Sequence, residues 1–249
     1  MSEDHHLYAT YSRGYRAGGF TQLSPDPSQP PLYKYKPEYS NNIEVGMKNS
    51  LVHNRLRVNI AAFYSKVVDS QVPTLVIPQA LTATQNAGEL TSKGIEFELS
   101  ATPSKGVQVE YMFGYTDARF DELSVPNQQT DDGSDVISLE GNRQLFTPEF
   151  TSMLAAQFTP HISEWQSLKL LVRGEALYLG DQYFDLANNI KQKAYSLFNA
   201  RAGVMGKNFE VTFWMRNITD KKYISYAYDF GGTHLGDPQN MGFTLRGMF

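Results

Sequence analysis

The sequence contains no cysteine, so it has neither a disulfide scaffold nor a thiolate metal site. It has no run of about 18 apolar residues, which excludes a transmembrane helix. Its net charge of -4 is small and does not provide the positively charged surface that nucleic-acid binding requires. We recognise no signal peptide, because no positively charged start is followed by an apolar core. We therefore expect the chain either to stay inside the cell or to be a piece of a longer protein.

Aromatic residues, by contrast, are abundant, with 15 Tyr and 15 Phe against only 2 Trp. Such rings suit β-strands, and they also suit membrane interfaces. The mean hydropathy of -0.40 is that of a soluble protein. A membrane barrel has a similar value, however, because half of each strand's side chains face a polar lumen. Composition alone therefore leaves both classes open.

Apolar and polar residues alternate with period 2 along much of the chain, whereas helical spacing is nearly absent. In "RLRVNIAAFYS", Leu56, Val58 and Ile60 lie on one face and Arg57 and Asn59 on the other. The pattern predicts about ten strands, mostly longer than the usual five or six residues and long enough to cross a bilayer when tilted. They are expected at 5–17, 38–48, 55–66, 90–102, 106–119, 147–159, 167–180, 194–204, 208–217 and 240–249.

The connections between these predicted strands alternate between short and long. The short ones are "NSLVHN", "PSKG", "PHISEWQ" and "MGKN". The long ones are rich in Pro, Gly, Asp and Asn, as in "DELSVPNQQTDDGSDVISLEGNRQLF". This asymmetry is typical of outer-membrane barrels, which have short periplasmic turns and long extracellular loops. The sequence therefore predicts an all-β fold that forms a portion of an antiparallel transmembrane β-barrel.

Five segments, in order along the chain, resemble the barrel of TonB-dependent outer-membrane receptors. They are "YATYSRGYRAGGF", "KPEYSNNIEVGMKNS", "NAGELTSKGIEFELSATP", "MRNITDKKYISY" and the terminal strand ending on Phe249. The resemblance implies that residues 1–249 are the C-terminal portion of the barrel domain, without the plug and the N-terminal strands. It implies TonB-dependent uptake of a bulky ligand, such as an iron–siderophore complex, across the outer membrane of a Gram-negative bacterium.

The resemblance also implies the partners: outer-membrane lipid, the TonB complex acting through the missing plug, the barrel-assembly machinery and a small-molecule ligand. It implies no cofactor and no nucleic acid. Family members grip their ligand with external loops, which points to loop tyrosines and acidic residues. The candidate ligand-binding residues are Tyr33, Tyr35, Asp131, Asp132, Tyr226, Tyr228, Asp229 and His234.

Three further groups of residues have expected roles. Asn217 and Asp220 are expected to bond backbone groups in a turn, and Gly94 to let a strand bend. In the last strand, Phe243, Leu245 and Phe249 are expected to face lipid and to signal to the assembly machinery. The polar faces of the strands are expected to stabilise the inner wall and contact a plug through Glu44, Lys48, Arg57, Glu96, Glu98, Glu110, Lys169, Arg173, Glu175, Arg201, Glu210, Arg216 and Arg246.

Two other classes of protein fit parts of the pattern. A free-standing ten-strand outer-membrane enzyme of the protease type would need Asp and His side chains at the external rim. Of the histidines, only His234 falls in an external loop, whereas His5, His6, His53 and His161 fall at the periplasmic end. We therefore expect no catalytic residue and no metal site. A soluble β-sandwich binding module is the other alternative, and strand length and loop asymmetry argue against it.

Overall fold

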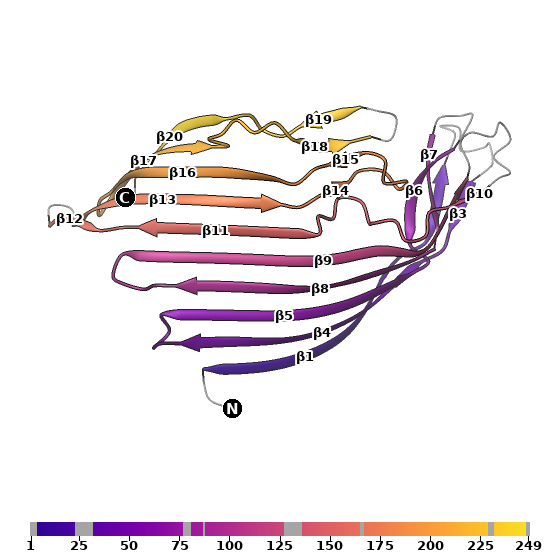
Figure 1. The fold of residues 1–249 in the computed structure, drawn as a ribbon, viewed down its shortest axis with the longest axis horizontal. Coiled ribbons are helices and arrows are strands. Elements are labelled where there is room, and N and C mark those ends of the chain that lie inside the picture. Colours follow the sequence, from indigo (N-terminus) through magenta and orange to yellow (C-terminus); the bar gives the residue numbers. More distant parts are fainter. Residues whose placement is uncertain are drawn as a thin grey trace.

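The computed structural model describes residues 4–22, 32–76, 81–86, 88–126, 136–164, 167–228 and 232–247. One antiparallel sheet contains the long strands, each paired with its neighbours along the chain (Figure 1). In order across the sheet they are β1 (His5–Arg16), β4 (Glu38–Leu51), β5 (Leu56–Val68), β8 (Gly88–Ala101), β9 (Val107–Pro126), β11 (Phe150–Phe158), β13 (Leu168–Leu179), β16 (Tyr195–Met205), β17 (Phe209–Arg216) and β20 (Asn240–Gly247). Within the described residues, no helix is long or apolar enough to cross a membrane.

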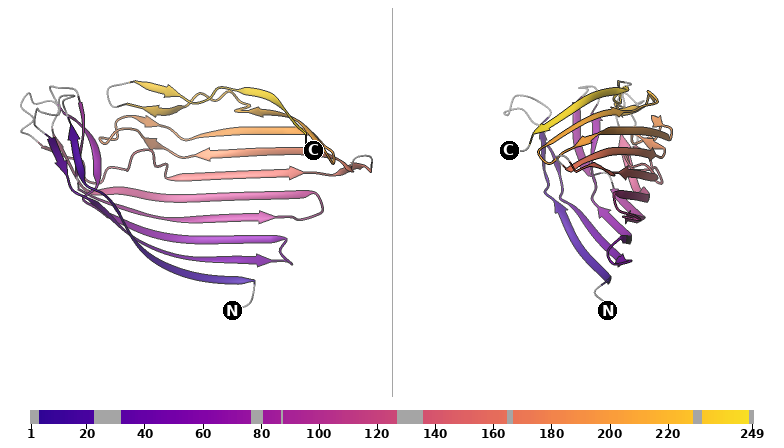
Figure 2. Two further views of the ribbon diagram at one scale, coloured as in Figure 1. Left: turned by 180° about the vertical axis from the view of Figure 1, so that it is seen from behind. Right: turned by 90° about the vertical axis from the view of Figure 1, so that its left-hand side faces the viewer.

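Each of these strands coincides with a predicted one, so the period-2 interpretation is confirmed. The main difference in length is at β9, which was expected to end at 119 but continues to Pro126. Beyond residue 119, β9 still pairs with β8 as far as Leu123. Its last three residues pair with the short β10 (Val136–Ser138). The sheet is strongly curved and open, with β1 and β20 at its two ends (Figure 2).

The two ends of the sheet differ as predicted. Tight turns join the strands at one end, with a small addition, β12 (His161–Ser163), that pairs with β13. At the other end the long connections form hairpins of their own, which the sequence did not reveal (Figure 1). These hairpins are β2 (Gly19–Gln22) with β3 (Leu32–Tyr35), β6 (Gln71–Val76) with β7 (Leu81–Asn86), β14 (Gln182–Tyr183) with β15 (Lys191–Gln192), and β18 (Ile224–Ala227) with β19 (Thr233–Leu235).

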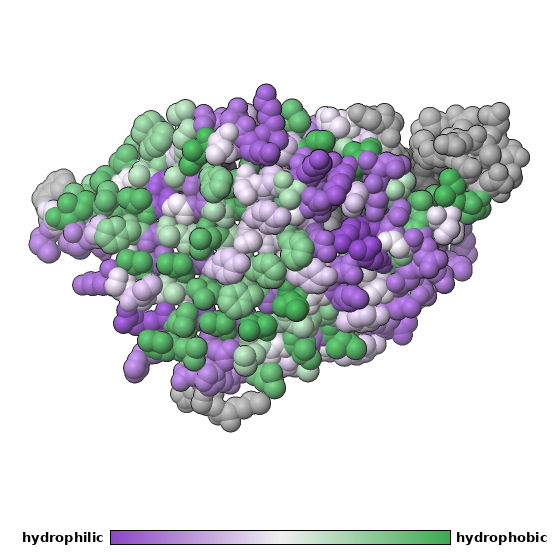
Figure 3. Space-filling view, in the orientation of Figure 1, coloured by the Kyte–Doolittle hydropathy of each residue, from purple (hydrophilic) through white to green (hydrophobic). Residues whose placement is uncertain are grey.

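The strand registers give the sheet two chemically different faces. Phe213 pairs with Phe243, and Val211 with Leu245, so these residues share the outer face. Phe243 and Leu245 are 78% and 80% exposed, respectively. Hydrophobic side chains spread over the strands in Figure 3, whereas hydrophilic ones gather toward the end that carries the long loops. The outer face therefore has the apolar surface that a lipid-facing wall requires.

The opposite face is concave and carries the polar residues of the alternation. Side chains on this face lie closer together, and Thr212 and Leu171 are 4% and 3% exposed. Arg173 donates hydrogen bonds to Glu110, 2.8 Å away, and to Glu175, 2.7 Å away. The inner-wall interpretation of the charged residues thus agrees with the register.

Near the long-loop end, a small apolar core lies on the concave face. Leu90, Phe120, Leu123 and Val72 are buried there. Partly buried side chains from two strands and two connections pack against them, namely Val67 of β5, Val125 of β9, Leu139 and Leu145 between β9 and β11, and Leu186 between β13 and β16. This core fixes the bases of the long loops to the sheet and so gives the loop residues a defined position.

Gly94 has a packing role in this sheet, beside the bend that the sequence predicts there. A Cβ atom at position 94 would lie 2.1 Å from the Tyr115 carbonyl oxygen and 2.7 Å from the Phe63 ring. Overpacking of this kind costs about 1–3 kcal/mol. We therefore expect Gly94→Ala to lower the urea midpoint of the detergent-refolded protein. The matched control is Gly174→Ala, because a Cβ there has nothing within 4 Å; equal midpoints for the two variants would contradict the packing argument.

Candidate ligand-binding site

An aromatic cluster at the long-loop end joins three connections that lie far apart in the sequence. The Phe146 ring stacks on Tyr226, with centroids 5.2 Å apart and an interplanar angle of 14°. Phe184 meets the Phe146 ring edge-on at 5.4 Å. Phe184 is buried at 3% exposure, whereas Phe146 and Tyr226 are 44% and 40% exposed. The cluster therefore has a buried base and an accessible aromatic surface.

Tyr228 and His234 extend the same cluster along the β18–β19 hairpin. Tyr226 pairs with His234 across the hairpin, and their rings lie 6.3 Å apart. The Tyr228 ring lies 4.7 Å from Tyr226 and 6.0 Å from His234. Rings arranged in this way offer flat apolar faces together with phenol and imidazole polar atoms. Such a surface suits a bulky ligand that combines apolar and polar groups.

Phe146 is held in an unusual backbone conformation. Its φ is 55°, in the left-handed region that a bulky residue rarely adopts. Strain of this kind costs on the order of 1–3 kcal/mol and persists only where the surroundings enforce it. Here the Phe146 N–H donates to the Tyr183 carbonyl at 2.9 Å, and the ring is held between Phe184 and Tyr226. The strained backbone of Phe146 thus places its ring on the accessible surface.

The connection between β13 and β16 provides a rigid base for Phe146. The Asp185 carboxylate is buried and accepts the N–H groups of Ile190 at 2.7 Å and Asn189 at 3.1 Å. Asn188 bonds the backbone of Arg143 in both directions, accepting at 2.7 Å and donating at 3.1 Å. Hydrogen bonds therefore join the β9–β11 connection to the β13–β16 connection directly beneath the aromatic cluster.

The connection that carries Tyr226 is anchored as the "NITD" segment predicts. Asn217 is buried, and its amide donates to the carbonyls of Lys221 and Asp237 at 3.0 and 2.9 Å. Asp220 accepts the Gln239 N–H at 3.0 Å. Tyr223 stacks on Tyr195 of β16, with centroids 4.5 Å apart. The expected turn-forming role of Asn217 is thus confirmed by its bonds to Lys221, whereas the Asp220 carboxylate bonds a distant backbone group and ties the start of the connection to its end.

The structure brings together only some of the predicted ligand-binding residues. Tyr226, Tyr228 and His234 meet in the cluster, whereas Tyr35 lies on the separate β2–β3 hairpin, with its hydroxyl group against Gly19. Tyr33 pairs with Thr21 in that hairpin, but its side chain is outside the described part. Asp131, Asp132 and Asp229 lie outside the described residues, as does Phe249.

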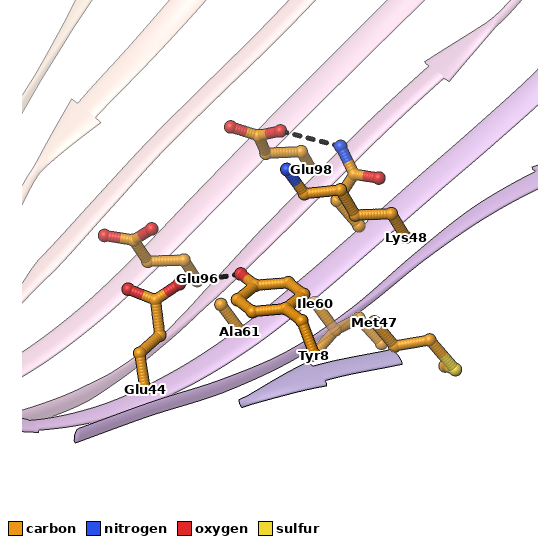
Figure 4. Close-up of a pocket in the computed structure, with 9 residues that line it drawn as sticks. Tyr8, Glu44, Met47, Lys48, Ile60, Ala61, Glu96 and Glu98 are labelled. Carbon is orange, nitrogen blue, oxygen red and sulfur yellow. Dashed lines mark hydrogen bonds between the residues drawn. The ribbon is translucent and has the colours of Figure 1, made fainter. Parts of the chain in front are cut away.

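A second recess lies on the concave face among β1, β4, β5 and β8 (Figure 4). Glu44, Glu96 and Glu98 line it. The Tyr8 hydroxyl donates to Glu44 at 2.7 Å, and the Lys48 ammonium lies 5.5 Å from the centre of the Tyr8 ring. Three of the four charged side chains that line it are acidic, so it suits a cationic group better than an anion.

Comparison with known proteins identifies the architecture. Residues 1–218 match the family described as "TonB dependent receptor-like, beta-barrel". The chain belongs to this family. It is also similar to the ferrichrome outer membrane transporter/phage receptor of Escherichia coli K12, with 25% identity over 209 residues, covering 81% of this chain and 25% of the relative.

Solved structures agree on the fold. The ferric yersiniabactin uptake receptor of Yersinia pestis has a TM-score of 0.80 at 20% identity, covering all of this chain and 36% of the receptor. A siderophore receptor of Acinetobacter baumannii has a TM-score of 0.77 at 18% identity, covering 99% of this chain and 34% of the receptor. The chain thus spans about a third of the length of these receptors and a quarter of the curated relative.

The family membership indicates which end of the sheet lies on which side of the membrane. Tight turns are periplasmic and long loops external in outer-membrane barrels. The aromatic cluster therefore lies on the external side. His234 is in this cluster, whereas His5 and His161 are at the periplasmic end, in β1 and β12. The relatives named above are transport receptors and not enzymes, which favours the non-enzymatic prediction.

The β14–β15 hairpin is closed by an ion pair whose strength depends on pH. The Lys191 ammonium lies 2.5 Å from the Asp181 carboxylate, which also accepts the Ala194 N–H at 2.7 Å. Lys191 first, and then the Ala194 N–H, hold the pKa of Asp181 below its usual range. Because the folded-state pKa is lowered, this stabilisation is complete above the ordinary Asp pKa of about 3.9 and is lost as pH falls through the folded-state value.

We therefore expect the amides of residues 182–194 to be better protected from hydrogen exchange in the wild type than in Asp181→Asn at neutral pH. The difference should disappear in acid, below the ordinary Asp pKa of about 3.9. Comparing the two proteins at each pH removes the contribution of other carboxylates. Equal protection at neutral pH would show that the ion pair does not hold the hairpin.

Proposed function

We propose that this chain is the C-terminal portion of an outer-membrane receptor barrel that takes up an iron–siderophore complex in a TonB-dependent manner. The observation that carries the proposal is the external aromatic cluster on a membrane-spanning sheet of this family. The relatives named above support the choice of ligand, because they are receptors or transporters for ferrichrome, ferric yersiniabactin and another siderophore. The TonB complex would act through the plug domain of such a receptor.

The external cluster suits this role because its position is fixed while its surface is accessible. Phe184 and the Asp185-centred turn hold Phe146 from below, and the β18–β19 hairpin holds Tyr226 beside it. A preorganised aromatic surface binds without a large loss of side-chain entropy. A flat or apolar part of the ligand would stack on the rings, and its polar groups would reach the Tyr228 hydroxyl and the His234 ring.

The proposal predicts saturable binding by the detergent-refolded chain. Titration with a ferric hydroxamate and a ferric catecholate siderophore should quench intrinsic fluorescence with at least one of them. Because an aromatic pair contributes about 0.5–1.5 kcal/mol beyond area burial, Phe146→Ala and Tyr226→Ala should each weaken binding by up to roughly tenfold. Tyr35→Ala tests whether the β2–β3 hairpin also takes part.

Tyr64→Ala is the matched control, because Tyr64 is a similarly exposed tyrosine, at 45%, on the outer face of β5. Binding that is lost equally in Tyr64→Ala would point to general loss of structure. Binding that is unchanged in both Phe146→Ala and Tyr226→Ala would contradict the proposed site.

We further propose that the terminal strand signals to the barrel-assembly machinery through Phe243, Leu245 and Phe249. Support comes from β20, where Phe243 and Leu245 project from the outer face and are almost fully exposed. The strand thus has an accessible apolar side that a binding partner could recognise.

On this basis, Phe249→Ala in cells should reduce the membrane-inserted fraction several-fold, measured by heat-modifiable migration on a gel. The free energy of unfolding of the same variant refolded in detergent should stay within about 0.5 kcal/mol of the wild type, because the proposed role is in recognition and not in packing. Met241→Ala is the control, because Met241 shares the outer face of β20. Equal insertion of the two variants would rule out a specific terminal signal.

A further inference from the structure

Two external hairpins lie side by side, although β4 and β5 separate them in the sequence (Figure 1). The β2–β3 hairpin connects β1 to β4, the β6–β7 hairpin connects β5 to β8, and β7 packs against both β2 and β3. The β6–β7 hairpin leaves the sheet where Asp69 and Gly88 have φ values of 53° and 129°. The Ser70 N–H donates to the Gly88 carbonyl at 2.9 Å and so closes the stem of this hairpin.

The β6–β7 hairpin begins at Gln71, whose polar groups all bond the β1–β4 connection. Gln71 is buried, at 8% exposure. Its side-chain amide donates to the carbonyls of Ala17 at 3.0 Å and Lys36 at 2.9 Å, and its amide oxygen accepts from the Arg16 Nε at 2.7 Å. Its backbone N–H donates to the Glu38 carboxylate at 2.7 Å. Because Ala17 and Lys36 precede and follow the β2–β3 hairpin, one side chain holds both of its stems.

Two further contacts join the same hairpins. Asn86 is the cross-strand partner of Gln71 in the β6–β7 hairpin. Its side chain accepts the Lys36 N–H at 2.6 Å and donates to the Lys36 carbonyl at 3.0 Å. Farther from the sheet, the Thr84 N–H donates to the Thr21 hydroxyl at 3.1 Å. The first rung of one hairpin thus holds the base of the other, and their upper parts are also bonded.

These bonds depend on each other. A glutamine side chain has an acceptor oxygen and an amide nitrogen with two N–H donors, and here both groups bond the neighbouring connection. A buried polar group that loses its partner is costly, so separating the hairpins would break several bonds and leave the Gln71 amide unpaired. No sequence pattern reveals this, because the bonded residues lie about 35 to 55 positions apart.

We propose that Gln71 is a positioning residue that makes the β2–β3 and β6–β7 hairpins one unit, so that a ligand contact on one hairpin also orders the other. Tyr35, a predicted ligand-binding residue, lies on this unit. Tyr226 lies on the β18–β19 hairpin, which Asn217 anchors separately. The part of this inference that concerns the ligand rests on the proposed function, whereas the joining of the two hairpins does not.

Hydrogen exchange in the full chain refolded in detergent tests the joining. Gln71→Ala should speed exchange of the β2 and β3 amides on the order of tenfold, although the change lies in the other hairpin. The amides of the β18–β19 hairpin should be unaffected. The converse variant, Thr21→Val, removes an acceptor in the β2–β3 hairpin and should speed exchange of the Thr84 amide in the other hairpin. Thr21→Val also provides the test if Gln71→Ala does not refold.

Gln85→Ala is the matched control, because it makes the same chemical change in the same hairpin. Gln85 pairs with Val72, and among the described residues its side chain has no hydrogen bond to the β1–β4 connection. It should leave exchange in β2 and β3 unchanged. Gln71→Glu keeps an acceptor for Arg16 but loses the donors to the two stem carbonyls, so it should not restore protection. Effects confined to the mutated hairpin, or equal effects of Gln85→Ala and Gln71→Ala, would overturn the proposal.

The ligand-dependent part is tested by adding a saturating ferric hydroxamate or ferric catecholate siderophore. In the wild type, exchange should slow in both hairpins together. In Gln71→Ala, it should slow only in the hairpin that the siderophore contacts. Joint slowing in Gln71→Ala would overturn the positioning role, whereas a wild type that binds neither siderophore would contradict the proposed function and leave the ligand-free exchange result to decide this inference.

Discussion

The structure depends on one constraint: in a hydrocarbon environment, every backbone N–H and C=O group must pair with another strand. The inner strands meet it by pairing on both edges with their sequence neighbours in continuous antiparallel registers, whereas β1 and β20 each pair on one edge within the described residues. Only a few irregularities interrupt these registers, such as the bulge at Glu89 and Leu90 near the external end. The regular ladder fixes which residues face lipid, and so the two faces of the sheet follow from it.

Because the outer face of the sheet is largely apolar, most polar chemistry is concentrated in two places. One is the concave wall, where Arg173, Glu110 and Glu175 form an ion-pair network. The other is the external end, where the connections are long enough to fold. The periplasmic turns are too tight for a comparable site; the turn after β4 places Val52, His53 and Asn54 in succession at positive φ. The external aromatic cluster is therefore located where the architecture permits one.

The sequence predicted the parts of the structure that period 2 controls. Strand positions, the two faces and the lipid-facing Phe243 and Leu245 all follow from alternation. The anchoring of Asn217 was also predictable, because Asn and Asp in such a turn bond nearby backbone groups. Phe146 was missed because its role depends on a left-handed backbone and on Phe184 and Tyr226, and no local pattern connects these positions. For Gly94, the sequence showed a special position, whereas the reason is the space taken by Phe63.

The same reasoning explains why the concave wall could be predicted as charged, whereas the way in which its charges pair could not. Arg173 and Arg201 occupy equivalent inward positions in their strands, and alternation alone treats them alike. Only the register shows that they face each other and that both carboxylates reach Arg173. The wall thus supplies both carboxylates to one arginine of a like-charged pair, whereas Arg201 donates to the Gln157 amide oxygen. That difference is a property of strand pairing, because the registers decide which side chains lie within reach of each other.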